Sequence, residues 1–162
     1  MEITLRFAER KDSLDILAWR NDPVTVRFSP TGAVKLEDHL KWFEDKLSSL
    51  NTNIFIALQE QNKIGMIRFD REGRSAEVSI NLNPDYRGKG YGKKCLEQAV
   101  YLYFTNFPVY ELTARIMPEN AASINIFTKI GFKQNERESK EATKMLYFSL
   151  QKDYFLSLIP EQ

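Results

Sequence analysis

Three glycines flanked by cations form the chemically most suggestive stretch of the chain, residues 87–93, which read Arg-Gly-Lys-Gly-Tyr-Gly-Lys. Apolar and polar residues alternate over the preceding residues 76–82, which is typical of a half-buried strand. After the stretch, apolar residues recur at helical spacing, so a helix is expected to begin near Gly90. Glycines at a helix start let a ligand approach the backbone, and the unpaired N–H groups of the first turn attract anions. The stretch therefore predicts a cradle for a pyrophosphate or a phosphate ester.

The glycine spacing excludes two other phosphate loops. A dinucleotide fingerprint requires G-x-G-x-x-G, whereas Gly88, Gly90 and Gly92 fall at every second residue. A P-loop requires a longer gap between its glycines and a Ser or Thr after its Lys, and neither is found here. The remaining pattern, Arg87-x-x-Gly90-x-Gly92 after a strand, resembles the coenzyme A pyrophosphate loop of the GNAT superfamily of N-acetyltransferases.

A second stretch, residues 120–132, resembles the other cofactor motif of this superfamily. In such enzymes its Asn begins a helix beside the pantetheine arm, and its Gly-Phe pair ends that helix and starts a strand. The residues agree with this, because Asn120 suits a helix N-cap and Gly131 suits the position after the last helical residue. The two motifs together imply acetyl-CoA as the cofactor, used as a co-substrate. The residues expected to bind it are Leu82, Arg87, Gly88, Lys89, Gly90, Tyr91, Gly92, Lys93, Asn120, Ser123 and Phe127.

The resemblance implies direct transfer of an acetyl group from acetyl-CoA to a primary amine. The amine must be neutral when it attacks, the carbonyl oxygen needs a hydrogen-bond donor, and the leaving thiolate benefits from a proton. In the superfamily a backbone N–H at or near Leu82 supplies that donor. Glu77 is a candidate base, directly or through a water, and Ser79 is a second candidate site residue. The alternative is that Glu77 only makes a surface or structural ion pair.

Two positions depart from common family patterns. Many members carry a Tyr seven residues after the motif Asn as general acid, whereas this chain has Phe127. Some protein-modifying members hold a Glu base where this chain has Arg115. The catalytic residues of those relatives therefore do not transfer to this sequence, and a coenzyme-binding module with weakened turnover stays an alternative.

The N-terminal third is expected to select the acceptor, because it forms the wall opposite the cofactor in this superfamily. Trp-Arg-Asn-Asp-Pro at 19–23 and His-x-x-Trp-Phe at 39–43 resemble ribosomal-protein N-terminal acetyltransferases and, more closely, the aminosugar-nucleotide acetyltransferases of pseudaminic acid biosynthesis. The leading hypothesis is therefore a nucleotide-activated amino sugar as acceptor, as in the glycan precursors of flagellin glycosylation. A protein N-terminus or another small amine is the runner-up. The candidate substrate residues are Arg20, Asn21, Arg27, His39 and Trp42.

These five residues also have structural interpretations. Trp42 is as well suited to the core, and His39 lies beside an apolar helical stripe where a half-buried structural histidine is equally expected. Arg20 and Arg27 could form structural ion pairs, and residues 21–23 could be only a turn.

Composition permits this reading and excludes several others. The 162 residues suit a single acetyltransferase domain, 1–162, and 23 basic against 22 acidic residues give a net charge of +1, so no global field draws nucleic acid. One Cys and one His argue against a metal site. With no signal-peptide pattern or long apolar run, a cytoplasmic protein without a membrane segment is expected. The assembly state stays open, with a homodimer as one candidate.

The order of elements predicts an α/β (α+β) fold. Strands are expected at 3–8, 54–58, 64–69, 76–82, 112–116, near Phe132 and at 145–150. Helices are expected after Ser13, over 36–47, from Gly90 and from Asn120, with a loop over 70–75. The hairpin at 54–69 makes the central strands antiparallel. This order matches the twisted, mixed and mostly antiparallel GNAT sheet with helices on both faces.

Overall fold

The computed structural model describes residues 2–136 and 144–161 of the chain. Its strands form one seven-stranded sheet in the order β1-β2-β3-β4-β5-β7-β6. The strands are β1 (Thr4–Phe7), β2 (Thr52–Gln59), β3 (Asn62–Glu72), β4 (Ser75–Leu82), β5 (Glu111–Ile116), β6 (Lys133–Asn135) and β7 (Leu146–Gln151). Neighbouring strands are antiparallel except β4 and β5, which are parallel. The predicted mixed, mostly antiparallel sheet is therefore confirmed.

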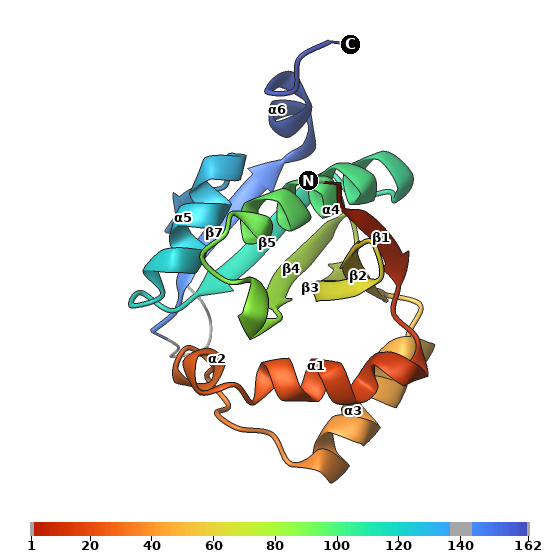
Figure 1. Ribbon diagram of the computed structural model, residues 1–162. Coiled ribbons are helices and arrows are strands. Elements are labelled where there is room, and N and C mark those ends of the chain that lie inside the picture. The colour runs from red at the N-terminus through yellow and green to blue at the C-terminus, as the bar shows by residue number, and fades with distance from the viewer. Residues whose placement is uncertain (1, 137–143, 162) are drawn as a thin grey trace.

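Helices cover both faces of this sheet (Figure 1). They are α1 (Ser13–Arg20), α2 (Pro23–Arg27), α3 (Leu36–Ser48), α4 (Tyr91–Asn106), α5 (Ala121–Ile130) and α6 (Lys152–Ser157). The first three lie together on one side of the sheet, and α4 and α5 lie on the other (Figure 1). Within the described residues, no helix combines the length and the apolar character needed to cross a membrane.

Two apolar cores, one on each face, hold the helices to the sheet. The larger core joins the sheet to α4 and α5 and includes Leu96 and Phe127, and the smaller one joins it to α1 and α3 through Ile16 and Phe43. Consecutive residues of a strand point to opposite faces, so the central strands must be apolar on both sides. Each large apolar side chain that is fully buried contributes about 1.5–3 kcal/mol.

The predicted loop over residues 70–75 is wrong. Strand β3 continues to Glu72, and only Gly73 and Arg74 separate it from Ser75, the first residue of β4. Gly73 has φ +61°, a conformation that glycine adopts without strain and that a two-residue hairpin turn requires. The long hairpin places Asp70 within the sheet, directly opposite Glu77.

Helices α2 and α6 were not predicted. The start of α2 carries a local sequence signal, because Asp22 is followed by Pro23. The Asp22 carboxylate accepts hydrogen bonds from the main-chain N–H groups of Val24 and Thr25. With only five residues, α2 is too short to give an apolar period in the sequence. The other expected elements are confirmed, with boundaries that differ by a few residues.

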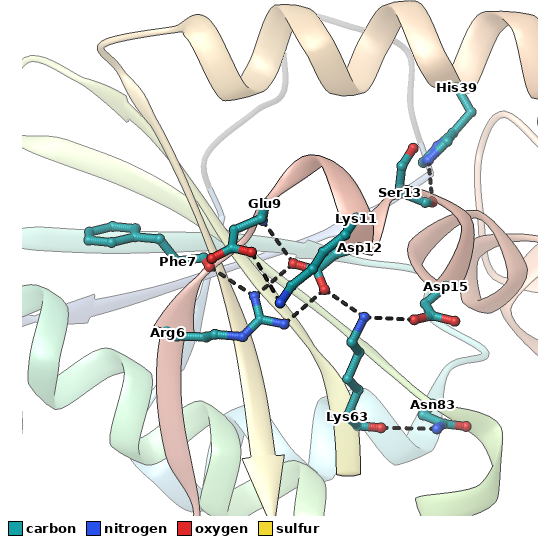
Figure 2. A network of polar contacts seen from close by, with 10 residues as sticks. All are labelled: Arg6, Phe7, Glu9, Lys11, Asp12, Ser13, Asp15, His39, Lys63 and Asn83. Atoms are coloured by element: carbon teal, nitrogen blue, oxygen red, sulfur yellow. Dashed lines mark hydrogen bonds and ion pairs between the residues drawn. The ribbon is translucent and has the colours of Figure 1, made fainter. Parts of the chain in front are cut away.

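A buried ion-pair network ties β1 and α1 to the β2–β3 hairpin (Figure 2). Asp12, which is 0% exposed, accepts two hydrogen bonds from the Arg6 guanidinium, at 2.7 and 2.9 Å, and lies 2.7 Å from Lys63 Nζ. Lys63 also contacts Asp15 at 2.8 Å. Burial raises the pKa of Asp12, but the hydrogen bonds from Arg6 and Lys63 outweigh burial, so the net pKa lies well below the ordinary value.

Replacing Asp12 by Asn should lower the free energy of unfolding by about 3–5 kcal/mol at pH 7, because two cations then lose a buried partner. A carboxyl group with a depressed folded-state pKa stabilises the protein above its unfolded-state value of about 3.9, and that stabilisation is lost as the pH falls below it. The difference between the two proteins, measured by urea unfolding, should therefore shrink between about pH 4 and pH 2. Asp15→Asn is the control, because Asp15 pairs with the same lysine but its side chain is 53% exposed. This variant should lower the free energy of unfolding by less than about 1 kcal/mol. Equal losses for both variants would contradict this account.

Candidate active site

Strands β4 and β5 diverge, and a cleft opens between them. They pair only over Ser75–Glu77 of β4 and Glu111–Thr113 of β5, and beyond those residues the ladder stops. A cleft of about 570 Å³ is lined by the later parts of both strands, by α5 and by the segment that contains α2. The predicted cradle, which follows β4, lies at the same end of the sheet (Figure 1).

The hydrogen-bond phase of the β3–β4 ladder decides which N–H groups face this cleft. Asn83 donates its main-chain N–H to the Ile64 carbonyl oxygen at 2.7 Å. Hydrogen-bonded pairs alternate with non-hydrogen-bonded pairs in an antiparallel ladder, so the N–H groups of Leu82, opposite Gly65, and of Ile80 point away from β3. They point toward β5 at a level where β5 no longer pairs with β4. The cleft therefore has main-chain donors on the wall where a thioester oxygen is expected.

The cradle has the backbone that an anion site needs. Gly88 and Gly90 have φ +72° and +82°, and a Cβ at either position would meet no atom within 4 Å, so their conformation, not crowding, calls for glycine. Gly92 is different, because a Cβ there would lie 2.8 Å from Ile126 Cδ1 of α5. Glycine at 92 thus lets α4 pack closely against α5, while Gly88 and Gly90, just before the helix, are exposed. The first-turn N–H groups of a helix are the groups that attract an anion.

The second motif forms the opposite side of the cleft. Asn120 caps α5, since its Oδ1 accepts the Ser123 main-chain N–H at 3.2 Å, and its Nδ2 donates to Ser123 Oγ at 3.1 Å. The predicted N-cap is therefore confirmed. Asn120, Ser123 and Phe127 all line the cleft. Phe127 is 3% exposed and packs edge-on against Phe132, so it supplies apolar surface and no hydroxyl.

The predicted coenzyme residues divide into two groups. Leu82, Arg87 and Gly88 line the cleft. Asn120, Ser123 and Phe127 line it too, as described above. Three side chains of the cradle instead have partners elsewhere: Lys89 Nζ donates to the Asp85 carbonyl oxygen, Tyr91 donates its hydroxyl to Gln59, and Lys93 pairs with Glu97. Lys89, Tyr91 and Lys93 are not among the residues that line the cleft. Their role in binding the coenzyme stays a prediction.

Cations and an indole form the wall opposite β5. Arg20 and Arg68 lie over the Trp42 ring, with their guanidinium carbons 4.3 and 5.1 Å from its centroid, and all three line the cleft. Arg68 stands directly opposite Ser79 on β4 and binds Asp70 at 2.8 Å. Arg68 was not among the predicted residues, because its place follows from the β3–β4 register and no local pattern marks it.

His39 lies behind this wall. It is 0% exposed, and its Nε2–H donates to the Ser13 carbonyl oxygen at 2.8 Å (Figure 2). Its Nδ1 accepts from Arg20 at 3.1 Å. Burial lowers the pKa of His39, and the nearby charge of Arg20 lowers it further, so the ring is neutral. The prediction of direct substrate contact does not fit this burial, and His39 instead orients Arg20.

Two further predicted substrate residues are not part of the cleft wall. The Asn21 side chain pairs with both main-chain groups of Val34, at 2.7 and 2.8 Å, and so fixes the loop between α2 and α3. Arg27 is exposed, with its guanidinium 6.0 Å from the Phe28 ring centroid. Of the five residues, Arg20 and Trp42 line the cleft, and their role in substrate binding stays a prediction.

Glu77 and Ser79 lie on the face of β4 that carries the arginines. Ser79 lines the cleft, whereas Glu77 lies two residues earlier, at the last pair of the β4–β5 ladder. Both Glu77 carboxylate oxygens accept hydrogen bonds from Arg115, at 2.8 and 3.1 Å. A proton taken up by Glu77 would displace one of these bonds. The catalytic roles of both residues stay predictions.

Comparison with known proteins agrees with this geometry. The family model for the Acetyltransferase (GNAT) domain matches residues 2–133. The chain is 30% identical over 139 residues to the putative phosphinothricin acetyltransferase YwnH of Bacillus subtilis, covering 80% of this chain and 83% of that protein. It is 25% identical over 118 residues to the acetyltransferase PseH of Campylobacter jejuni, covering 72% and 74%. The structure of spermidine N-acetyltransferase from Vibrio cholerae, in complex with CoA and spermine, superposes with a TM-score of 0.83 at 19% identity, covering 95% of this chain and 98% of that one.

The chain belongs to the GNAT acetyltransferase family. It is an N-acetyltransferase that depends on acetyl-CoA. The parted strands, the free N–H groups of β4 and the glycine cradle at the start of α4 all fit that co-substrate. Among the described residues, no group of three or more His, Cys, Asp or Glu side chains could hold a metal ion.

Replacing Gly90 by Glu should weaken coenzyme A binding at least about a hundredfold, because the new side chain adds a negative charge to an anion site and strains a backbone at φ +82°. Gly73→Glu is the matched control, since Gly73 also has positive φ and open surroundings but lies in the β3–β4 turn. It carries the same strain and charge, yet its dissociation constant, measured by calorimetry, should stay near that of the wild type. Similar losses in both variants would contradict the assignment of the cradle.

Proposed function

We propose that this acetyltransferase acts on a primary amine that also carries an anionic group, with a nucleotide-linked amino sugar as the leading acceptor. The observation that supports this most is the charge of the cleft. Among the described residues that line it, four are arginines and none is Asp or Glu. Asp70, Asp22 and Glu77 compensate three of these charges, so the positive charge of Arg20 is left to favour a pyrophosphate or carboxylate over a polycation.

Of the four arginines that line the cleft, Arg20 is the one whose charge is not balanced by a carboxylate. Arg68, Arg87 and Arg115 each bind a carboxylate, at 2.8, 2.7 and 2.8 Å. Arg20 instead donates to the neutral His39 ring, and among the described residues it makes no ion pair. Burial lowers the pKa of Arg20, and the charge of Arg68 lowers it further, so its charged form is destabilised as it stands. An acceptor anion would relieve that cost through a charge-assisted, bidentate hydrogen bond.

An amino-sugar nucleotide supplies the matching groups. Its pyrophosphate suits Arg20, its base or sugar ring suits the face of Trp42, and its amine would reach the end of β4 where the N–H groups of Ile80 and Leu82 polarise the thioester. The resemblance of residues 19–43 to aminosugar-nucleotide acetyltransferases supports this acceptor, and the chain is also similar to the acetyltransferase PseH of Campylobacter jejuni. The neutral amine would attack the carbonyl carbon, the carbon–sulfur bond would break, and the amine would lose one proton to solvent or to a nearby base. Because Phe127 has no hydroxyl, the thiolate would take up its proton from another hydroxyl or from solvent.

A phosphinothricin-like amino acid is the second candidate. It too joins a primary amine to acidic groups, and the chain is 30% identical to YwnH, which is named as a putative phosphinothricin acetyltransferase. Each of the two candidate acceptors carries an anionic group that Arg20 would bind. Spermidine, the substrate in the name of one structural neighbour, lacks such a group.

An acceptor panel tests the proposal directly. The protein would be incubated with acetyl-CoA and UDP-linked amino sugars, phosphinothricin, spermidine, an aminoglycoside or peptides, and free thiol would be followed. Thiol release with either anionic class supports the proposal. Release only with the polycations or the peptides contradicts it.

Arg20→Gln should raise the KM for the anionic acceptor about 10–100-fold, the value of a hydrogen bond to a charged group. The dissociation constant of coenzyme A should stay within about twofold, because Arg20 lies on the other side of the cleft from the cradle. Arg10→Gln is the control, since Arg10 is 81% exposed and its guanidinium pairs with Glu44. A KM that does not distinguish the two variants would remove Arg20 from the acceptor site.

For Glu77→Gln we expect a rate loss below about tenfold and an unchanged pH profile, because both carboxylate oxygens are committed to Arg115. The measurement is kcat/KM across pH for the accepted substrate. Disappearance of the acidic limb in the variant would instead identify Glu77 as the general base.

A further inference from the structure

One arginine joins the coenzyme cradle to the other side of the cleft. Arg87, the first residue of the coenzyme motif, donates from Nη1 to Asp22 Oδ2 and from Nη2 to Thr25 Oγ1, each at 2.7 Å. These contacts bridge 65 and 62 residues of sequence. Neither the sequence around Arg87 nor the sequence around Asp22 predicts these contacts.

The partners of Arg87 lie at the start of a segment whose far end, at Val34, is held by Asn21. Helix α2 contains no buried residue, and five residues are too few for a stable isolated helix. Asp22 therefore has two tasks, because its Oδ2 caps α2 through Val24 and Thr25 and also binds Arg87. The Arg87 hydrogen bond lowers the pKa of Asp22, so the carboxylate is charged throughout the neutral range. The α2 segment, residues 23–34, includes several residues that line the cleft.

The cradle loop that follows Arg87 also has few features that restrict its backbone. Arg87 is followed by Gly88 and Gly90, both with positive φ, and glycines confer conformational freedom on a loop that lacks a ligand. A pyrophosphate bound by the cradle would restrict that loop. Arg87 has five N–H donors, so it keeps donors for a ligand while it holds Asp22 and Thr25.

We infer that Asp22 and Thr25 are positioning residues that couple coenzyme binding to the order of the α2 segment. Ordering the cradle fixes the Arg87 guanidinium, and the guanidinium fixes the N-terminus of α2 and with it the wall that meets the acceptor. Coupling between two ligand sites is reciprocal, so an acceptor that orders the α2 segment would tighten coenzyme binding by the same factor. The inference rests on the coenzyme site of the proposed function but not on the identity of the acceptor.

The double variant Asp22→Asn/Thr25→Val isolates the bridge from the cap. Asn caps a helix about as well as Asp, so α2 keeps its N-terminal hydrogen bonds while the ion pair loses its charge. Val keeps the branched shape of Thr and removes the oxygen that Arg87 binds. Asp38→Asn is the matched control, because Asp38 is an exposed acidic residue in the first turn of α3.

Hydrogen exchange with and without coenzyme A tests the coupling. In the wild type and in Asp38→Asn, saturating coenzyme A should slow amide exchange about tenfold both at residues 88–92 and in the α2 segment. In the double variant, protection at 88–92 should remain while protection of the α2 segment is lost. Protection of the α2 segment that is the same in all three proteins would overturn the inference. Absence of protection at 88–92 in the wild type would overturn the coenzyme site itself, whatever acceptor is used.

Discussion

The parting of β4 and β5 is the constraint on which the site depends. A parallel pair that stops after three residues leaves main-chain N–H groups of Ile80 and Leu82 without a strand partner. In a continuous sheet those N–H groups would donate to β5. No cleft would then separate the cradle from the wall formed by Arg20, Arg68 and Trp42. The same gap admits the co-substrate and exposes the donors that its carbonyl oxygen needs.

Charge is distributed unevenly around this gap. The carboxylates near the cleft, such as Asp22, Asp70 and Glu77, are each bound by an arginine that lines it. Their charges are thereby compensated, and Arg20 is left with a neutral histidine as its partner. The chain as a whole carries a net charge of only +1, so the cationic character is local to the cleft and is not a global field.

The predicted elements were correct where the signal is local. The N-cap at Asn120 and the helix start at Gly90 depend on a few adjacent residues, and both are confirmed. Side-chain directions were harder to predict, because Lys89 and Tyr91 sit in the motif yet bind Asp85 and Gln59. His39 has a residue type suited to a ligand site, but long-range packing buries it behind Arg20.

The sequence by itself determined the family and the coenzyme motifs, because glycine conformation, helix capping and strand alternation are set by neighbours along the chain. Only the tertiary structure decided which side chains share the cleft. Arg68 faces Ser79 through strand register, Arg115 holds Glu77 across the base of the gap, and Arg87 reaches Asp22 over 65 residues. Such contacts depend on how distant segments pack, and a one-residue change in register would send the same side chains to the opposite face.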